Sequence, residues 1–179
     1  MTNSIYFVGI DPGSKGALAI IDSKGSVVEI IDLDNNVVSY GMLFYRFGEE
    51  AYKDYYVAIE DVCGRPGQSC AANTTFMKLA GYAELLGCGM STEYLKVKPQ
   101  VWKKHFGLIF PKTMTKTEKK HKSIELAKDF FPAVAGQLTA SKDGRAEALL
   151  IARYMKDVYE STLGDKSREL VADFVQDVS

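Results

Sequence analysis

Apolar residues along the chain alternate between short β-branched runs and segments with helical spacing. The runs nearest the start predict three consecutive antiparallel strands joined by tight turns, at residues 5–11, 17–22 and 26–33. A helical segment at 40–52 separates them from a fourth strand at 55–60. Because a strand reached through a helix usually lies parallel to its neighbour, we expect the fourth strand to run parallel to the first.

The rest of the chain predicts mainly helices. In order, the pattern indicates a helix at about 71–86, a strand at 93–97, a short helix opened by Pro99, a helix at 119–131 and a long helix at 143–159. Residues 167–177 predict a last amphipathic helix or a loosely attached tail. The whole chain, 1–179, therefore predicts a single α/β domain with a core at about 5–158 and a C-terminal helix or tail at 160–179. Its five-stranded mixed sheet, antiparallel in the first three strands, would be flanked by helices.

Composition narrows the class of protein. No apolar run in the sequence approaches the length of a membrane span, and the polar first residues lack the pattern of a signal peptide. Three cysteines cannot all pair, and their spacing matches no zinc site, so we expect reduced thiols in a cytoplasmic protein. With only two histidines, a histidine-based metal site or a Ser-His-Asp triad is not expected.

The formal net charge of −1 conceals a basic segment. Residues 96–122 contain nine lysines and one acid, Glu118. The segment is either a surface that binds a polyanion or a solvated lysine-rich loop, and the run alone favours neither. A neighbouring cluster of acids would favour the polyanion.

Four acidic residues stand where the predicted elements would bring them together. Asp11 and Glu60 end apolar strands, whereas Asp143 and Glu147 lie one turn apart on one face of the long helix. Carboxylate oxygens suit Mg²⁺ or Mn²⁺, and two such ions at one acidic site can hydrolyse a phosphodiester. The acids therefore predict a two-metal site.

Each acid also has a simpler interpretation. Asp11 could cap a turn, Glu60 could simply reach solvent at a strand end, Asp143 could be an ordinary helix N-cap, and Glu147 could be a surface residue. Asp61 could act in place of Glu60. Strand alternation sends these two side chains to opposite faces, so only one of them can join Asp11, and Glu60 is favoured.

Five sequence blocks, in this order, resemble the RuvC-type Holliday-junction resolvases, especially the phage-borne members, within the RNase H-like superfamily. They are GIDPG at 9–13, IE at 59–60, GYAELL at 81–86, VKPQVWKK at 97–104 and DGRAEALLIA at 143–152. The resemblance covers roughly residues 5–158 and implies an RNase H-like fold. It also implies that Asp11, Glu60, Asp143 and Glu147 hold two Mg²⁺ ions per site, for which Mn²⁺ can substitute.

The chain departs from the bacterial pattern in three ways. The last acid is Glu147 rather than Asp, and its partner Asp143 lies four residues earlier rather than three. Both spacings keep the pair on one helical face, so we expect the chemistry to survive. Cys63 stands in the region where bacterial members often carry an aromatic residue. Junction opening and sequence preference are therefore not carried over from the bacterial enzymes.

The resemblance implies a metal-dependent crossover junction endodeoxyribonuclease that serves DNA recombination and repair, with paired nicks leaving 5′-phosphate and 3′-hydroxyl ends. Symmetric resolution needs two sites, so a homodimer is expected. Its candidate interface is the apolar face at 71–86 with Phe76, Met77 and Tyr82, which could equally be plain core. A phage-encoded copy would act in the host cytoplasm. The expected DNA contacts are Lys15, Arg65, Gln68, Lys98, Lys103, Lys104, Lys112, Lys116, Lys119 and Lys120.

Three other functions fit parts of the pattern. One is another RNase H-like nuclease, acting on RNA–DNA hybrids or flaps. A second is a junction-binding protein without cleavage, against which the four intact acids argue. A third is a sugar-kinase or actin-like ATPase, whose first phosphate motif also follows an apolar strand. That fold needs two such domains and a second phosphate loop, and 179 residues hold only one.

Overall fold

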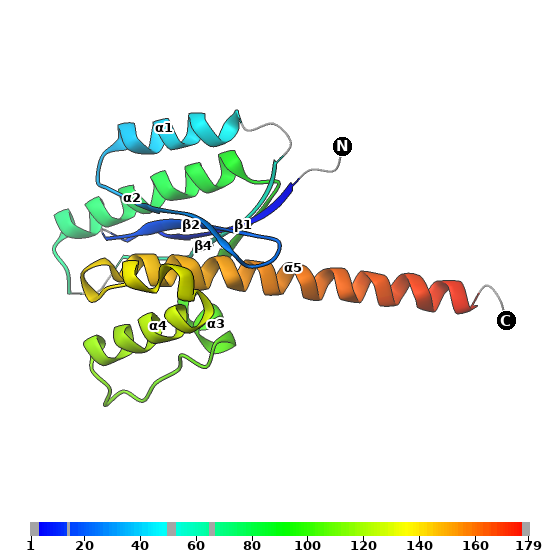
Figure 1. Cartoon of the computed structure of the whole chain (residues 1–179). Helices are drawn as coiled ribbons and strands as arrows, with labels where there is room; N and C mark the ends of the chain where they lie inside the picture. The colour runs from blue at the N-terminus through cyan, green and yellow to red at the C-terminus, as the bar shows by residue number, and fades with distance from the viewer. Residues whose placement is uncertain (1–3, 14, 50–52, 65–66, 177–179) are drawn as a thin grey trace.

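The protein folds around one mixed sheet. The computed structural model describes residues 4–13, 15–49, 53–64 and 67–176, and side chains as far as residue 163 (Figure 1). The strands lie in the order β3-β2-β1-β4-β5. β1, β2 and β3 are antiparallel neighbours, whereas β4 runs parallel to β1 and β5 parallel to β4. Their bounds are β1 Ser4–Asp11, β2 Ala17–Asp22, β3 Val27–Asp32, β4 Lys53–Glu60 and β5 Glu93–Val97. The predicted five-stranded topology is confirmed.

Helices cover both faces of the sheet (Figure 1). Alternation along β1 sends Phe7 into one core and Val8 into the other, because successive side chains of a strand point to opposite faces. One core lies under α1 and α2, and the other under α3, α4 and α5. The helices are α1 Val37–Gly48, α2 Cys70–Met90, α3 Pro99–His105, α4 Lys116–Phe130 and α5 Asp143–Gln176, with short 3₁₀ turns at Pro132–Gln137 and Ala140–Lys142.

The last helix, α5, crosses β1 at a glycine. A Cβ on Gly9 would overlap the carbonyl oxygen of Ala148 and the backbone nitrogen of Ala152. A second glycine, Gly144, lies against the carbonyl of Lys15 in the turn between β1 and β2. Glycine at both positions lets the backbones approach closely. The start of α5 is thereby held beside the end of β1.

Two helices begin at polar caps ahead of their predicted starts. The helix expected at 40–52 begins at Val37 because the Asn36 side chain caps it, and it ends at Gly48. The helix expected at 119–131 begins at Lys116, since Thr115 and Glu118 form a capping box. These polar caps precede the apolar pattern from which the boundaries were predicted.

Of the two alternatives for 167–177, a last helix or a loosely attached tail, the structure shows helix as far as residue 176, as a continuation of α5. α5 runs without interruption from Asp143 to Gln176 and extends beyond the sheet (Figure 1). No proline interrupts this stretch, and Gly164 in its interior costs only about 1 kcal/mol in a helix. Residue 177 lies outside the described residues. In the part of the chain that the structure describes, no helix combines the length and hydropathy of a membrane span.

The face of α2 proposed as a dimer interface divides between core and surface. Tyr82 packs on Tyr40, with ring centroids 5.6 Å apart, beside the buried Leu79 and Ala83. Met77, by contrast, is 44% exposed. Plain core packing therefore accounts for Tyr82, whereas Met77 is accessible to another molecule.

Candidate active site

Asp11 and Glu60 end adjacent parallel strands. Ile10 of β1 lies opposite Ile59 of β4, so the two acids that follow are neighbours across the strands. Ala58, two residues before Glu60, packs in the core beneath α5, and Glu60 therefore points to the same side. Asp11 shares this face with the glycine at which α5 crosses β1.

Asp61 points away from this group. Its carboxylate lies 3.7 Å from Lys96 Nζ, which also pairs with Glu84 of α2 at 3.0 Å. The structure thus places Glu60, rather than Asp61, beside Asp11, as strand alternation predicts.

The Asp11 carboxyl lies in a strongly perturbing environment. Burial, followed by the negative charges of Glu147 and Glu60, raises its pKa to about 8. The Gly13 N–H, which donates to Asp11 Oδ1 at 3.1 Å, and the charge of Lys103 act in the opposite direction but do not compensate. Three acids from β1, β4 and α5 are therefore close enough to repel one another, which is the arrangement that a bound cation relieves.

Basic side chains hold the two acids of α5. Lys103 Nζ lies 3.2 Å from Glu147 Oε1, and Lys120 forms an ion pair with Asp143. Both lysines were expected on DNA; the structure instead pairs them with the candidate ligands. The reason is that α3 and α4 pack against α5, which brings their lysines over its first turns.

Trp102 is a member of the site that the sequence reasoning missed. Its buried indole Nε1–H donates to Glu60 Oε1 at 3.1 Å. The available signal was weak: a lone tryptophan beside a strand end, whose N–H needs a partner once it is buried.

The side chains of this site have the right chemistry to bind a divalent cation, but their arrangement is not that of a preformed metal site. Within residues 4–13, 15–49, 53–64 and 67–163, no group of three or more His, Cys or acidic side chains is already arranged to hold a metal ion. The donors are nevertheless hard carboxylate oxygens, and burial together with the charges of Glu147 and Glu60 raises the pKa of Asp11. Cation binding at Glu147 and Asp143 would require Lys103 and Lys120 to move aside.

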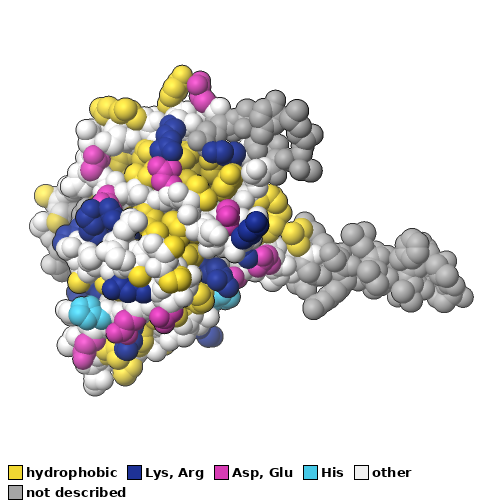
Figure 2. Space-filling view, viewed as in Figure 1, with side chains coloured by type: hydrophobic (Ala, Val, Ile, Leu, Met, Phe, Trp, Pro, Cys, Tyr) yellow, Lys and Arg dark blue, Asp and Glu magenta, His cyan; other side chains and the backbone are white. Residues whose placement is uncertain are grey.

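The remaining expected DNA contacts lie on the surface. Arg65 falls outside the described residues, and Gln68 is exposed. Lys and Arg side chains alternate with Asp and Glu over the face shown in Figure 2, so this face is not uniformly basic. Among the lysines expected to contact DNA, those that form no ion pair with another described residue are Lys15, Lys98, Lys104, Lys112, Lys116 and Lys119.

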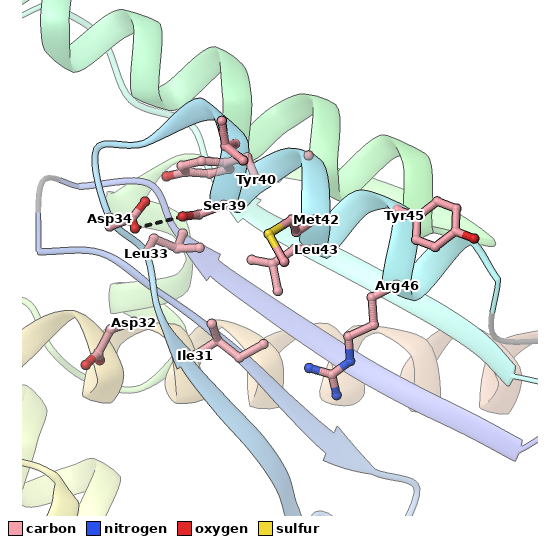
Figure 3. Close-up of a pocket in the computed structure, with 12 residues that line it drawn as sticks. Ile31, Asp32, Leu33, Asp34, Ser39, Tyr40, Met42, Leu43, Tyr45 and Arg46 are labelled. Atoms are coloured by element: carbon pink, nitrogen blue, oxygen red, sulfur yellow. Dashed lines mark hydrogen bonds between the residues drawn. The ribbon is translucent and has the colours of Figure 1, made fainter.

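A groove of about 860 Å³ lies between β3 and α1 (Figure 3). Leu33, Met42 and Leu43 give it apolar walls, and Asp34 with Ser39 forms a hydrogen bond of 2.8 Å at one end. Its lining includes none of the four candidate acids. The residues that line the groove are therefore different from those of the acidic site.

Two solved structures match this fold over most of its length. "T. thermophilus RuvC in complex with Holliday junction substrate" has a TM-score of 0.51 and 14% identity, covering 89% of this chain and 96% of that chain. The chain has the RuvC fold. "Thermus thermophilus RuvC structure" has a TM-score of 0.50, 16% identity and the same coverage. No protein-family model and no curated protein sequence matches the chain. The resemblance to RuvC read from the five sequence blocks is thus confirmed at the level of fold.

Proposed function

We propose that this protein is a metal-dependent endonuclease that cuts branched DNA, preferentially four-way junctions. The observation that carries the proposal is the Asp11 carboxyl, whose pKa is raised to about 8 by burial and by Glu147 and Glu60. Perturbed carboxyls of this kind cluster at functional sites. The similarity of the fold to T. thermophilus RuvC in complex with a Holliday junction substrate supports branched DNA as the substrate.

In the proposed site, Asp11, Glu60, Asp143 and Glu147 would hold two Mg²⁺ ions, for which Mn²⁺ could substitute. Two bound ions of this kind activate the attacking water and stabilise the leaving 3′ oxygen. The chain's own part is to lose the Asp11 proton and to release Lys103 and Lys120 from their carboxylates. No side chain is needed as a nucleophile, and the products would be nicks with 5′-phosphate and 3′-hydroxyl ends.

The unpaired lysines would hold the DNA backbone around this site. Lys15 lies in the turn after Asp11, Lys98 precedes α3, and Lys104 lies in its last turn. Arg65 and Gln68, in the segment after Glu60, are proposed to reach the crossover. A homodimer would place two such sites about a two-fold axis, as paired nicks require.

The test is cleavage of an end-labelled synthetic four-way junction with Mg²⁺ or with a chelator. Flaps, duplex and an RNA–DNA hybrid serve as competing substrates. We expect paired nicks in the junction that DNA ligase can reseal, because the ends carry 5′-phosphate and 3′-hydroxyl groups. Preferred cutting of flaps or the hybrid would support the other nuclease class, and binding without cutting would support a binding protein.

Asp61, the acid next to Glu60, supplies the matched control. Asp11→Asn and Glu60→Gln should abolish cleavage but leave junction binding nearly intact, because the lysine contacts to phosphate remain. Asp61→Asn changes a carboxylate one position along the chain that pairs with Lys96 on the other side of the sheet, so it should cut normally. Full activity of Asp11→Asn in Mg²⁺ would contradict the site.

A further inference from the structure

Trp102 makes a contact that the proposed chemistry does not explain. Trp102 lies on α3 and its side chain is fully buried. Its Nε1–H donates to Glu60 Oε1 at 3.1 Å. We propose that Trp102 is a positioning residue, an inference that rests on the proposed function. It would hold the Glu60 carboxylate in the orientation in which it shares a divalent cation with Asp11.

The chemistry of the two groups supports this role. An indole N–H is a donor only, and a buried carboxylate is an acceptor only, so the bond between them has one direction and is assisted by charge. Glu60 is itself only 9% exposed. Partners that orient a metal-binding side chain from outside typically change metal affinity or activity by about 10–100-fold when removed.

The element that carries Trp102 is firmly placed. Pro99 occupies the first turn of α3, where its fixed backbone angle favours helix. At the other end, the Leu108 N–H donates to the Lys103 carbonyl at 2.7 Å. The indole itself packs in the core beneath α5. A rigid donor therefore meets the flexible glutamate, rather than two flexible chains meeting each other.

The next residue shows why a neutral donor matters. Lys103 Nζ lies 4.8 Å from the centre of the Trp102 ring and 3.2 Å from Glu147 Oε1. Consecutive residues of α3 thus contact acids from β4 and from α5. The Lys103 ammonium repels an arriving cation and must move, whereas the uncharged indole can keep its bond to Glu60. Trp102 then keeps its bond to Glu60, while Lys103 gives up its place at Glu147 to the cation.

Trp102 is the only tryptophan in the chain, which makes the contact directly observable. In a ¹⁵N-labelled protein the single indole N–H resonance should move upfield in Glu60→Gln, which weakens the bond. Mn²⁺ should broaden the same resonance at concentrations that support cleavage. Asp61→Asn should leave both effects unchanged. A resonance insensitive to Glu60→Gln and to Mn²⁺ would overturn the proposal.

Removal of the donor gives the functional test. Trp102→Phe, or biosynthetic replacement of the one tryptophan by benzothienylalanine, keeps a buried aromatic but lacks the N–H. We expect the Mg²⁺ concentration for half-maximal cleavage and the Kd for Mn²⁺ to rise about 10-fold or more. Junction affinity in chelator should not change. Phe131→Leu, in the same core, controls for loss of packing and should leave the Mg²⁺ requirement unaltered.

The outcomes separate this inference from the proposed function. A wild-type requirement for Mg²⁺ in the benzothienylalanine protein would overturn the role of Trp102 but leave the nuclease in place. A wild-type protein that cuts no substrate would contradict the proposed function. The inference would still be supported if the indole signal responded to Mn²⁺ and loss of the N–H weakened Mn²⁺ binding.

Discussion

The environment of Asp11 should make the free energy of unfolding depend on pH. Because its pKa is raised to about 8, the folded protein holds a proton that the unfolded chain releases near its ordinary pKa. This group's contribution to stability is therefore complete below pH 3.8 and is lost as the pH rises towards 8. Each tenfold difference in proton affinity between the folded and unfolded chain corresponds to about 1.4 kcal/mol.

The first prediction follows from that sign. In chelator, Asp11→Asn should be more stable than wild type at pH 8, and the difference should shrink as the pH falls to 4. Urea unfolding at several pH values measures it. Saturating Mg²⁺ should reduce the difference by stabilising the wild type alone. A difference that is the same at every pH would show that Asp11 is not desolvated as described.

Glu147 tests the longer spacing of the acids on α5. Glu147→Asp withdraws the carboxylate by about 1.5 Å, one carbon–carbon bond. Metal–oxygen distances tolerate only about 0.2 Å. We expect a large loss of cleavage rate in Mg²⁺, partly restored by Mn²⁺, with unchanged thermal unfolding. A wild-type rate in Mg²⁺ would show that Glu147 does not bind the metal directly.

At the scale of elements, the crossing of α5 over β1 should be intolerant of any side chain. Gly9→Ala places a Cβ against the backbone of Ala148 and Ala152, so the helix must shift. Overpacking of this kind costs roughly 1–3 kcal/mol, and rigid backbone atoms put it at the upper end. We expect lower stability by urea unfolding together with loss of cleavage, because α5 carries two of the acids.

Gly81→Ala is the matched control for that variant. Gly81 lies within α2, and a Cβ there would meet no atom within 4 Å. Alanine in the body of a helix is favoured over glycine by about 1 kcal/mol. This variant should therefore be at least as stable as wild type and fully active. If Gly9→Ala behaved in the same way, the close crossing would be wrong.

A second contact ties the start of α5 to the edge strand. Asp32, at the end of β3, accepts from Lys142 at 2.7 Å and from Arg145 at 2.5 Å, and these flank Asp143. Hydrogen bonding from Arg145 is the main cause that lowers the Asp32 pKa to about 2. The stabilisation is therefore present above pH 3.8 and is lost as the pH falls towards 2.

Asp32→Asn should accordingly lower stability at pH 7 but have little effect near pH 2. The Asp32 side chain is 43% exposed, so solvent screening limits the expected loss to about 1 kcal/mol or less. Thermal unfolding at the two pH values measures it. A loss that persists at pH 2 would indicate a packing defect in place of the ion pairs.

At the scale of the whole molecule, the ion pairs indicate which lysines are available to contact DNA phosphates. Replacing Lys98, Lys104, Lys112 and Lys116 by Ala should weaken junction binding. For every lysine that binds a phosphate, its removal should lower the slope of log K against log salt by roughly 0.9. The control replaces Lys122, which pairs with Glu125, and should leave the slope unchanged. An unaltered slope in the fourfold variant would mean that these lysines are merely solvated.

The sequence predicts the sheet well because strand signals are local. Alternation and turns set the bounds of β2 and β5, and alternation alone separates Glu60 from Asp61. The partners of the acids are different. The contacts of Trp102 and Lys103 depend on how α3 packs across the core, and no spacing in the sequence encodes that approach. The full extent of α5 was not predicted either, because the polar stretch at 160–166, which contains Gly164, separates its two apolar-periodic parts.

The crossing at Gly9 has a kinetic consequence. The contacts between β1 and α5 join the first strand to the last helix, so the loop that they close contains nearly every other element. Closing large loops delays folding. The repulsion between Asp11 and Glu147 arises only when that closure is made. A cation that binds the closed form should therefore slow unfolding, so that the lifetime of the folded chain in Mg²⁺ becomes a measure of site assembly that needs no DNA.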